Sequence, residues 1–178
     1  MDNDDLERDL RLVYGAYEYL RAHDLAGRST TSRLLRAGDL VYLAGRSSDE
    51  LRELEGTVAG THGHRGGRDD IVLEAYQSLY WLMLLAVAAG DRYDDLRPHV
   101  PLTRADVHAA LSLRDDAAVQ DAGTRRELRA HGFARVGAAC RHAGVPVEEA
   151  VRRDLRELRA KGYLDPYWGQ ADGPVAPL

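Results

Sequence analysis

Residues 71–89 read IVLEAYQSLYWLMLLAVAA, the most apolar stretch of a 178-residue chain. Apolar side chains occupy nearly every side of this stretch, which predicts a helix buried at the centre of a helical bundle. The run without strongly polar residues, 79–89, is shorter than the roughly 20 residues that a membrane span needs. Glu74 and Gln77 also disfavour insertion, so we expect no contact with a membrane.

The rest of the chain shows helical periodicity and lacks the sustained alternation of Val, Ile and Thr that marks strands. The fold class that we expect is therefore all-α. Ser48 is expected to cap the start of the third helix and Gly90 the end of the fourth, and the residues from Trp168 onward predict a frayed tail. The expected helices lie at about 3–23, 31–44, 49–59, 70–89 and 103–113, with two or three more within 125–161.

The composition is that of an ordinary globular protein, with 44% hydrophobic and 30% charged residues. The net charge of −5 argues against a protein that coats nucleic acid without specificity. Cys140 is the single cysteine, so we expect neither an intrachain disulfide nor a thiolate metal cluster. The acidic start, MDNDDLERDL, lacks the layout of a signal peptide, and we expect a cytoplasmic protein.

Glu74 stands inside the apolar helix, where an unpartnered carboxylate costs several kcal/mol or takes up a proton. Glu50 and Glu53, three residues apart, share one face of the preceding expected helix. If the two helices pack antiparallel across the glycine-rich loop, the three carboxylates converge. A divalent cation among them would relieve their repulsion, and oxygen ligands suit Mg²⁺ or Mn²⁺.

Three stretches together resemble the all-alpha nucleoside triphosphate pyrophosphohydrolases of the MazG type, and most closely the phosphoribosyl-ATP pyrophosphohydrolases of histidine biosynthesis. The resemblance implies a MazG-like helical bundle over residues 1–101, a nucleotide substrate, and a homodimer or larger homo-oligomer. The three stretches follow the family's order and are STTSRLL (29–35), DELRE (49–53), and EAYQSLYWLMLLAVAAG (74–90) running on into YDDL (93–96).

In that family two acidic motifs bind Mg²⁺, which holds the phosphates while water attacks and pyrophosphate leaves. Carried over by position, the resemblance makes Glu50, Glu53 and Glu74 the catalytic residues and metal ligands, with Mn²⁺ as the alternative ion. Gln77 and Asp70 complete the expected set of metal ligands. The residues expected to bind substrate are Arg33, Arg65, Arg68 and Gln77.

The chain departs from the family pattern at three places. Gln77 replaces an aspartate, Trp81 replaces a histidine, and Arg46 is the nearest basic residue to a lysine that often precedes the first motif. A neutral amide is a weaker ligand than a carboxylate, although Asp70, one turn before Glu74, can compensate for it. These departures argue against the histidine-pathway reaction itself.

The loop THGHRGGR (61–68) allows two interpretations. His62 and His64 suit a metal, but two histidines without a third ligand or a stiff scaffold rarely bind one tightly, which favours a mobile loop. Arg65 and Arg68 lie beside the expected site and suit contact with a substrate phosphate.

The resemblance ends near residue 101, and residues 102–178 form a helical C-terminal extension in this interpretation. Its stretch RVGAACRHAGVPVEEAVRRDLRELRAKGYL (135–164) resembles a helix-turn-helix with closely spaced arginines, so DNA binding is one alternative. The alternative that we favour is a helical cap in which Arg152, Arg153 or Tyr163 reaches the nucleotide.

Two functions therefore stay open. The first is a Mg²⁺-dependent hydrolase that releases pyrophosphate from a nucleoside triphosphate or a phosphoribosyl-linked nucleotide. The second is a catalytically degenerate regulator that senses a nucleotide or binds DNA. Gln77 favours the second function, whereas the retained glutamates favour the first.

Overall fold

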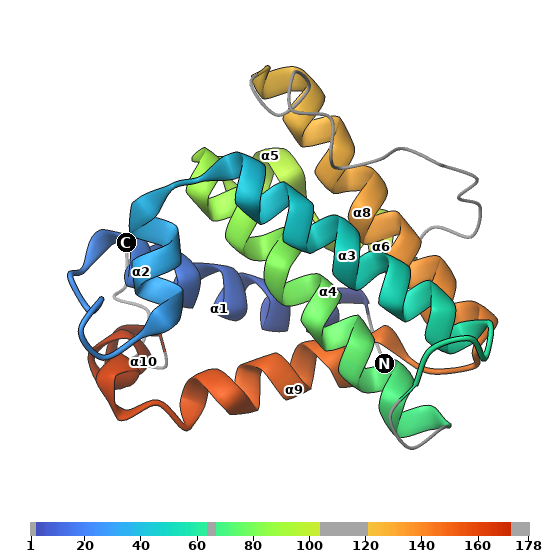
Figure 1. Cartoon of the computed structure of the whole chain (residues 1–178). Coiled ribbons are helices and arrows are strands. Elements are labelled where there is room, and N and C mark those ends of the chain that lie inside the picture. Colours follow the sequence, from blue (N-terminus) through green and yellow to red (C-terminus); the bar gives the residue numbers. More distant parts are fainter. Residues whose placement is uncertain (1–2, 64–66, 104–120, 172–178) are drawn as a thin grey trace.

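Helix α4 (Arg68–Ala89), formed by the apolar stretch, runs through the middle of the fold (Figure 1). This computed structural model describes residues 3–63, 67–103 and 121–171, and every element within those ranges is helical. The prediction of an all-α fold is confirmed. The elements that pack against α4 are α1 (Asn3–Ala22), α2 (Thr30–Ala37), α3 (Leu40–Val58), α8 (Ala122–His142) and α9 (Val147–Arg159).

The remaining elements are short. They are α5 (Tyr93–Leu96), α6 (His99–Thr103), the 3-10 turn η1 (Gly162–Leu164) and α10 (Asp165–Ala171). Trp168 is buried within α10, so the frayed tail expected from this residue onward is wrong for residues 168–171. The helix expected at 103–113 lies, apart from its first residue, outside the described residues.

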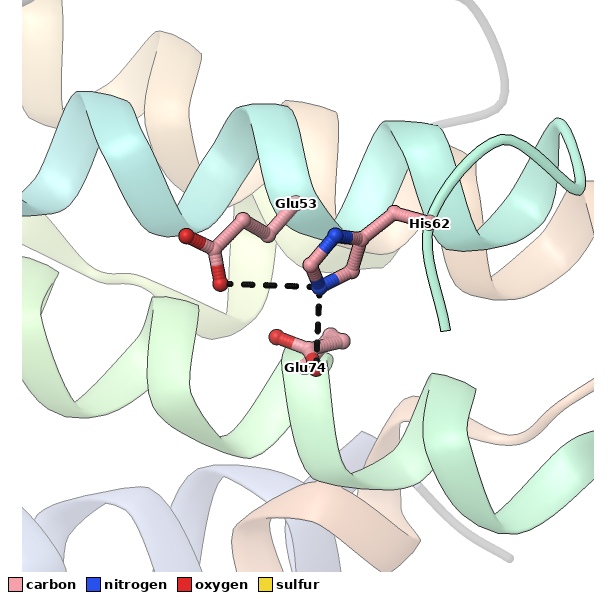
Figure 2. A group of neighbouring side chains, drawn as sticks. All are labelled: Glu53, His62 and Glu74. Atoms are coloured by element: carbon pink, nitrogen blue, oxygen red, sulfur yellow. Dashed lines mark ion pairs between the residues drawn. The ribbon is translucent and has the colours of Figure 1, made fainter. Parts of the chain in front are cut away.

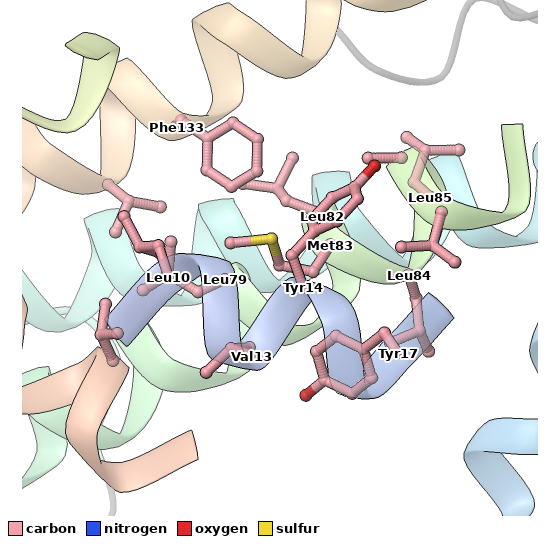
Figure 3. Packing of buried hydrophobic residues seen from close by; sticks show 14 of the residues in the cluster. Leu10, Val13, Tyr14, Tyr17, Leu79, Leu82, Met83, Leu84, Leu85 and Phe133 are labelled. Atoms are coloured by element: carbon pink, nitrogen blue, oxygen red, sulfur yellow. The ribbon is translucent and has the colours of Figure 1, made fainter. Parts of the chain in front are cut away.

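One hydrophobic core joins the two ends of the chain. Tyr17 of α1, Leu79 and Leu82 of α4, and Phe133 of α8 belong to the same buried cluster (Figure 3). By length and composition α4 could cross a membrane, but 56% of its most apolar window is buried in the fold. The core helices of soluble proteins share this character, and the expected burial of α4 is confirmed.

The chain forms α3 where two separate helices were expected. Gly38, in the left-handed conformation at φ 64°, ends α2, and the Asp39 side chain caps α3 by accepting a hydrogen bond from the Tyr42 N–H at 3.0 Å. Ser48 lies buried inside α3 and does not cap a helix, so that prediction is wrong. The expected break fails because α3 accommodates its serines: the Ser47 hydroxyl donates to the Leu43 carbonyl oxygen at 2.9 Å.

The C-terminal helices are fixed to the rest of the fold by close contacts. A Cβ atom at Gly137 would lie 2.0 Å from the carbonyl oxygen of Leu102, so α8 packs directly on the backbone of α6. Gly144, at φ 66°, turns the chain from α8 into α9. Helix α9 then packs along both α1 and α4, which brings its arginines next to the N-terminal half of α4.

Candidate metal centre

The candidate site lies on the hairpin formed by α3 and α4, which run side by side (Figure 1). The turn after α3 folds back on its last residues. The backbone N–H groups of Thr61 and His62 both donate to the carbonyl oxygen of Gly56, at 2.8 and 3.1 Å. Gly60 permits the reversal because it adopts φ 73°, a conformation that favours glycine.

Glycine at position 56 lets the turn approach α3 closely. A Cβ atom there would lie 3.0 Å from the Cβ atom of His62, a distance that side chains rarely tolerate. The close approach and the two hydrogen bonds together fix the imidazole of His62 above the seam between α3 and α4.

His62 meets one glutamate from each helix of the hairpin (Figure 2). Its Nε2 atom lies 3.7 Å from Oε2 of Glu53 and 3.9 Å from Oε1 of Glu74. One ligand atom from each of the three residues lies within 4.8 Å of the others. Glu74 is fully buried, whereas Glu53 and His62 are partly exposed, so the cluster is accessible to solvent through these two side chains.

Glu50 lies beside this cluster, one turn before Glu53 on α3. Its side chain is only 3% exposed, and Arg46 forms an ion pair with its Oε1 atom. Its Oε2 atom is buried, and the described residues place no well-aligned donor on it. Burial raises the pKa of the Glu50 carboxyl, and the charges of Glu53 and Glu74 add to the rise. Arg46 and the Trp81 side chain, which lies within hydrogen-bonding reach of the carboxyl group, oppose it.

The donor set fits a divalent cation. Metal–ligand bonds of about 2.1 Å hold two ligand atoms at most about 4.2 Å apart, so small side-chain rotations would close the cluster around an ion. The sequence predicts a set of ligands that are all oxygen atoms, whereas this cluster adds an imidazole nitrogen to two carboxylates. The mixed set suits Mn²⁺ and the softer ion Zn²⁺ better than an all-oxygen set does. The buried Oε2 atom of Glu50 offers a further oxygen on the same seam.

The structure places Asp70 and Gln77 along a groove between α4 and α9. Asp70 is 4% exposed, and Gln77 is half-buried. The groove has a volume of about 1160 Å³ and a polar lining. Its lining residues are Asp69, Asp70, Val72, Leu73 and Gln77 of α4 with Glu149, Arg152, Arg153, Arg156 and Glu157 of α9.

The residues expected to bind phosphate are dispersed. Arg33 is exposed on α2, where its guanidinium lies 3.5 Å from the Thr30 hydroxyl of the same helix. Arg68 forms an ion pair with Glu149, which lines the groove from α9. Arg65 and His64 lie outside the described residues.

Sequence reasoning favoured a loop without a metal role at 61–68, but the structure brings His62 to the two glutamates. The sequence feature that permits this position of His62 is the pair of glycines at 56 and 60, because together they allow the chain to turn back on α3. Trp81 also gains a local role, since its ring lies under the guanidinium of Arg46 at 5.0 Å, beside Glu50.

Comparison of the chain with models of known protein families, with curated proteins and with solved structures gives no significant match.

Proposed function

We propose that the protein is a metal-dependent nucleotide pyrophosphohydrolase of the MazG type. The observation that supports this proposal best is the convergence of Glu53, His62 and Glu74 from the α3–α4 hairpin, with Glu50 buried beside them. Buried carboxylates of one charge repel each other, and a divalent cation offsets that repulsion. The order of the acidic motifs along the chain supports the same function.

Each residue of the site has a defined task in this proposal. Glu53, His62 and Glu74 hold the ion, for which Mg²⁺ and Mn²⁺ are the candidates. When bound, such an ion would neutralise charge on the phosphates and would make water a better nucleophile. Glu50 lies next to the ligands and orients the attacking water through its buried carboxylate.

The proposed reaction is hydrolysis of the anhydride bond between the α and β phosphates. The oxygen of water forms a bond to the α phosphorus while the bond from that phosphorus to the bridging oxygen breaks. Pyrophosphate leaves with the bridging oxygen, and the proton lost by water passes through Glu50 to solvent. The nucleoside monophosphate, or the phosphoribosyl-linked monophosphate, is the second product.

A second candidate is a catalytically degenerate protein that senses a nucleotide or binds DNA. Gln77 supports this alternative, because an amide stands where the family has a carboxylate ligand. Helix α9, the second helix of the helix-turn-helix resemblance, carries exposed arginines at 152 and 156. Its partner α8 is 21 residues long, where that resemblance implies a short first helix.

The homodimer implied by the family resemblance is a further proposal, which light scattering on the purified chain would test.

The proposal is tested by pyrophosphate release with Mg²⁺ or Mn²⁺ over the common ribonucleotides, deoxyribonucleotides and phosphoribosyl-ATP. We expect release that disappears in Glu74→Gln and persists in Glu127→Gln, a matched change at an exposed position of α8. The melting temperature with and without Mn²⁺ provides a second measurement, because an ion that binds only the folded state raises it. Absence of both release and a Mn²⁺ shift in the unmodified chain would favour the degenerate alternative.

A further inference from the structure

The groove between α4 and α9 has two chemically different walls. The α4 wall carries Asp69, Asp70 and Gln77, and the α9 wall carries three arginines together with Glu149 and Glu157. With a volume of about 1160 Å³ the groove is larger than a simple ion site requires. Its lining counts four carboxylates against three guanidinium groups, so the groove alone is not a general site for anions.

Arg153 and Arg156 are the arginines of this groove whose charge is available to a ligand. Neither forms an ion pair with any residue in the described ranges 3–63, 67–103 and 121–171. The guanidinium of Arg153 lies over the ring of Tyr76 at 5.4 Å, which holds it against α4 without neutralising it. Arg156 is exposed along the groove.

Helix α9 holds these arginines on a rigid base. Its apolar face, with Val151 and Leu158, is part of the buried core, and its buried Asp154 is hydrogen-bonded to Tyr17 of α1. Arginines on a packed helix lose less conformational entropy on binding an anion than arginines on a free loop.

Two residues of α4 form a common border between the groove and the metal centre. Gln77 lines the groove and follows the metal-centre residue Glu74 by three positions, so the two side chains project from adjacent sides of one helix. Asp70 also lines the groove. A Cβ atom on Gly63, the neighbour of His62, would lie 3.2 Å from the Oδ2 atom of Asp70.

A ligand with several anionic oxygens suits this arrangement. Phosphate oxygens bind divalent cations held by carboxylates, and arginine binds phosphate through two parallel hydrogen bonds. We infer that the α4–α9 groove binds the phosphate chain of the substrate, with Arg153 and Arg156 holding the phosphates that leave as pyrophosphate. This inference rests on the proposed function and makes the C-terminal helices part of the active site.

The charge balance of the groove gives a thermodynamic signature. Without a cation, the carboxylates of the groove and of the metal centre repel a polyanion, so pyrophosphate binding should require the metal. By reciprocity, pyrophosphate should tighten Mn²⁺ binding by the same factor. A helix that binds the DNA backbone would show no such dependence on Mn²⁺.

The test is calorimetric titration of the full chain with inorganic pyrophosphate, with and without Mn²⁺. We expect binding with Mn²⁺ that weakens by about tenfold or more in Arg153→Gln and in Arg156→Gln, because each loses a charge-assisted pair. Arg126→Gln, an exposed change on α8, is the matched control and should leave the affinity unchanged. Arg156→Lys, which keeps the positive charge, should bind pyrophosphate more tightly than Arg156→Gln. The melting temperature of each variant reports whether it folds.

The outcomes separate this inference from the proposed function. If Mn²⁺ stabilises the chain and Glu74→Gln abolishes the effect, but the arginine variants bind pyrophosphate normally, the groove inference is wrong and the proposed function stands. If Mn²⁺ does not bind, the proposed function fails. The groove inference would then fail with it, because the carboxylates that line the groove require the metal before pyrophosphate can bind.

Discussion

The phenolic oxygen of Tyr17 lies 2.7 and 2.8 Å from the two carboxylate oxygens of Asp154, and this contact joins α1 to α9 inside the protein. Burial raises the pKa of Asp154 to about 7; the hydrogen bond from Tyr17 opposes the rise and the charge of Glu157 adds to it. Tyr76 and Tyr80 of α4 also face this carboxyl group. A carboxyl group that the arginine-bearing helix depends on therefore titrates near neutral pH.

The Asp154 contact predicts a stability that falls with rising pH. Between the ordinary value of 3.8 and about 7 the unfolded chain has lost the Asp154 proton while the folded chain retains it. The free energy of unfolding therefore decreases through this window, by at most about 1.4 kcal/mol per pH unit, and levels off above it. Urea unfolding of the unmodified chain and of Asp154→Asn, from pH 4.5 to 8, measures this contribution as a difference in slope.

Asp95→Asn, at an exposed position of α5, serves as the control for that series. It should keep the pH dependence of the unmodified chain. Equal slopes in the unmodified chain and Asp154→Asn would show that Asp154 is ionised in the folded protein throughout the window.

His62 predicts the choice of metal ion. Replacing its nitrogen ligand in His62→Asp gives an all-oxygen set, which suits Mg²⁺ better. The ratio of Mg²⁺ to Mn²⁺ affinity should rise by about tenfold, as measured by competition between the two ions. His142→Asp, an exposed substitution in α8, should leave the ratio unchanged. A ratio unaffected by His62→Asp would remove His62 from the ligand set.

Gln77→Asp introduces a carboxylate where the pattern of the resembled family has one. In the proposed enzyme it should raise the Mn²⁺ affinity by about tenfold, because a charged ligand replaces a neutral one at the border of the metal centre. The rate of pyrophosphate release should rise with it. Gln170→Asp, on the exposed surface of α10, adds the same charge elsewhere. If both variants behave like the unmodified chain, Gln77 does not take part in metal binding.

Alanine substitutions at two helical glycines should change the free energy of unfolding in opposite directions. Gly137→Ala forces a Cβ atom toward the Leu102 carbonyl oxygen and should cost about 3 kcal/mol of unfolding free energy. Gly45→Ala, inside α3 with no atom within 4 Å of its Cβ position, should stabilise by about 0.5–1 kcal/mol. Denaturant titration at one pH measures both. A destabilised Gly45→Ala would contradict an open position there.

The burial of α4 and the need of Glu74 for partners could be predicted from the sequence, because apolar periodicity and the cost of a buried charge are local properties. The start of α3 could not be predicted from the sequence, because Gly45, Ser47 and Ser48 are residue types that often end a helix. Their place in a helix depends on the Asp39 cap and on packing against α4. The position of His62 depends on a turn whose backbone N–H groups bond to the carbonyl oxygen of Gly56 in α3, a contact that no local sequence pattern specifies.

The groove between α4 and α9 could not be predicted from the sequence either, because no local pattern places α9 beside α4. Its position follows from contacts between residues far apart in the chain, such as Tyr17 and Asp154. The sequence predicts Arg152 and Arg153 as residues that reach a nucleotide, and it gives Arg156 only as one of the closely spaced arginines of residues 135–164. All three arginines line the same groove because α9 packs against α4.

The two halves of the proposed site also differ in how they form. The metal-centre residues belong to one helical hairpin, with at most 21 positions separating Glu53 from Glu74, whereas Tyr17 and Asp154 are 137 positions apart. Local contacts form early in folding, and distant ones must first overcome the entropy of closing a long loop. We therefore expect refolding chains to acquire the acidic hairpin first and to dock the basic helix later. A chain emerging from the ribosome would likewise complete the acidic hairpin of the proposed site well before α9 has been synthesised.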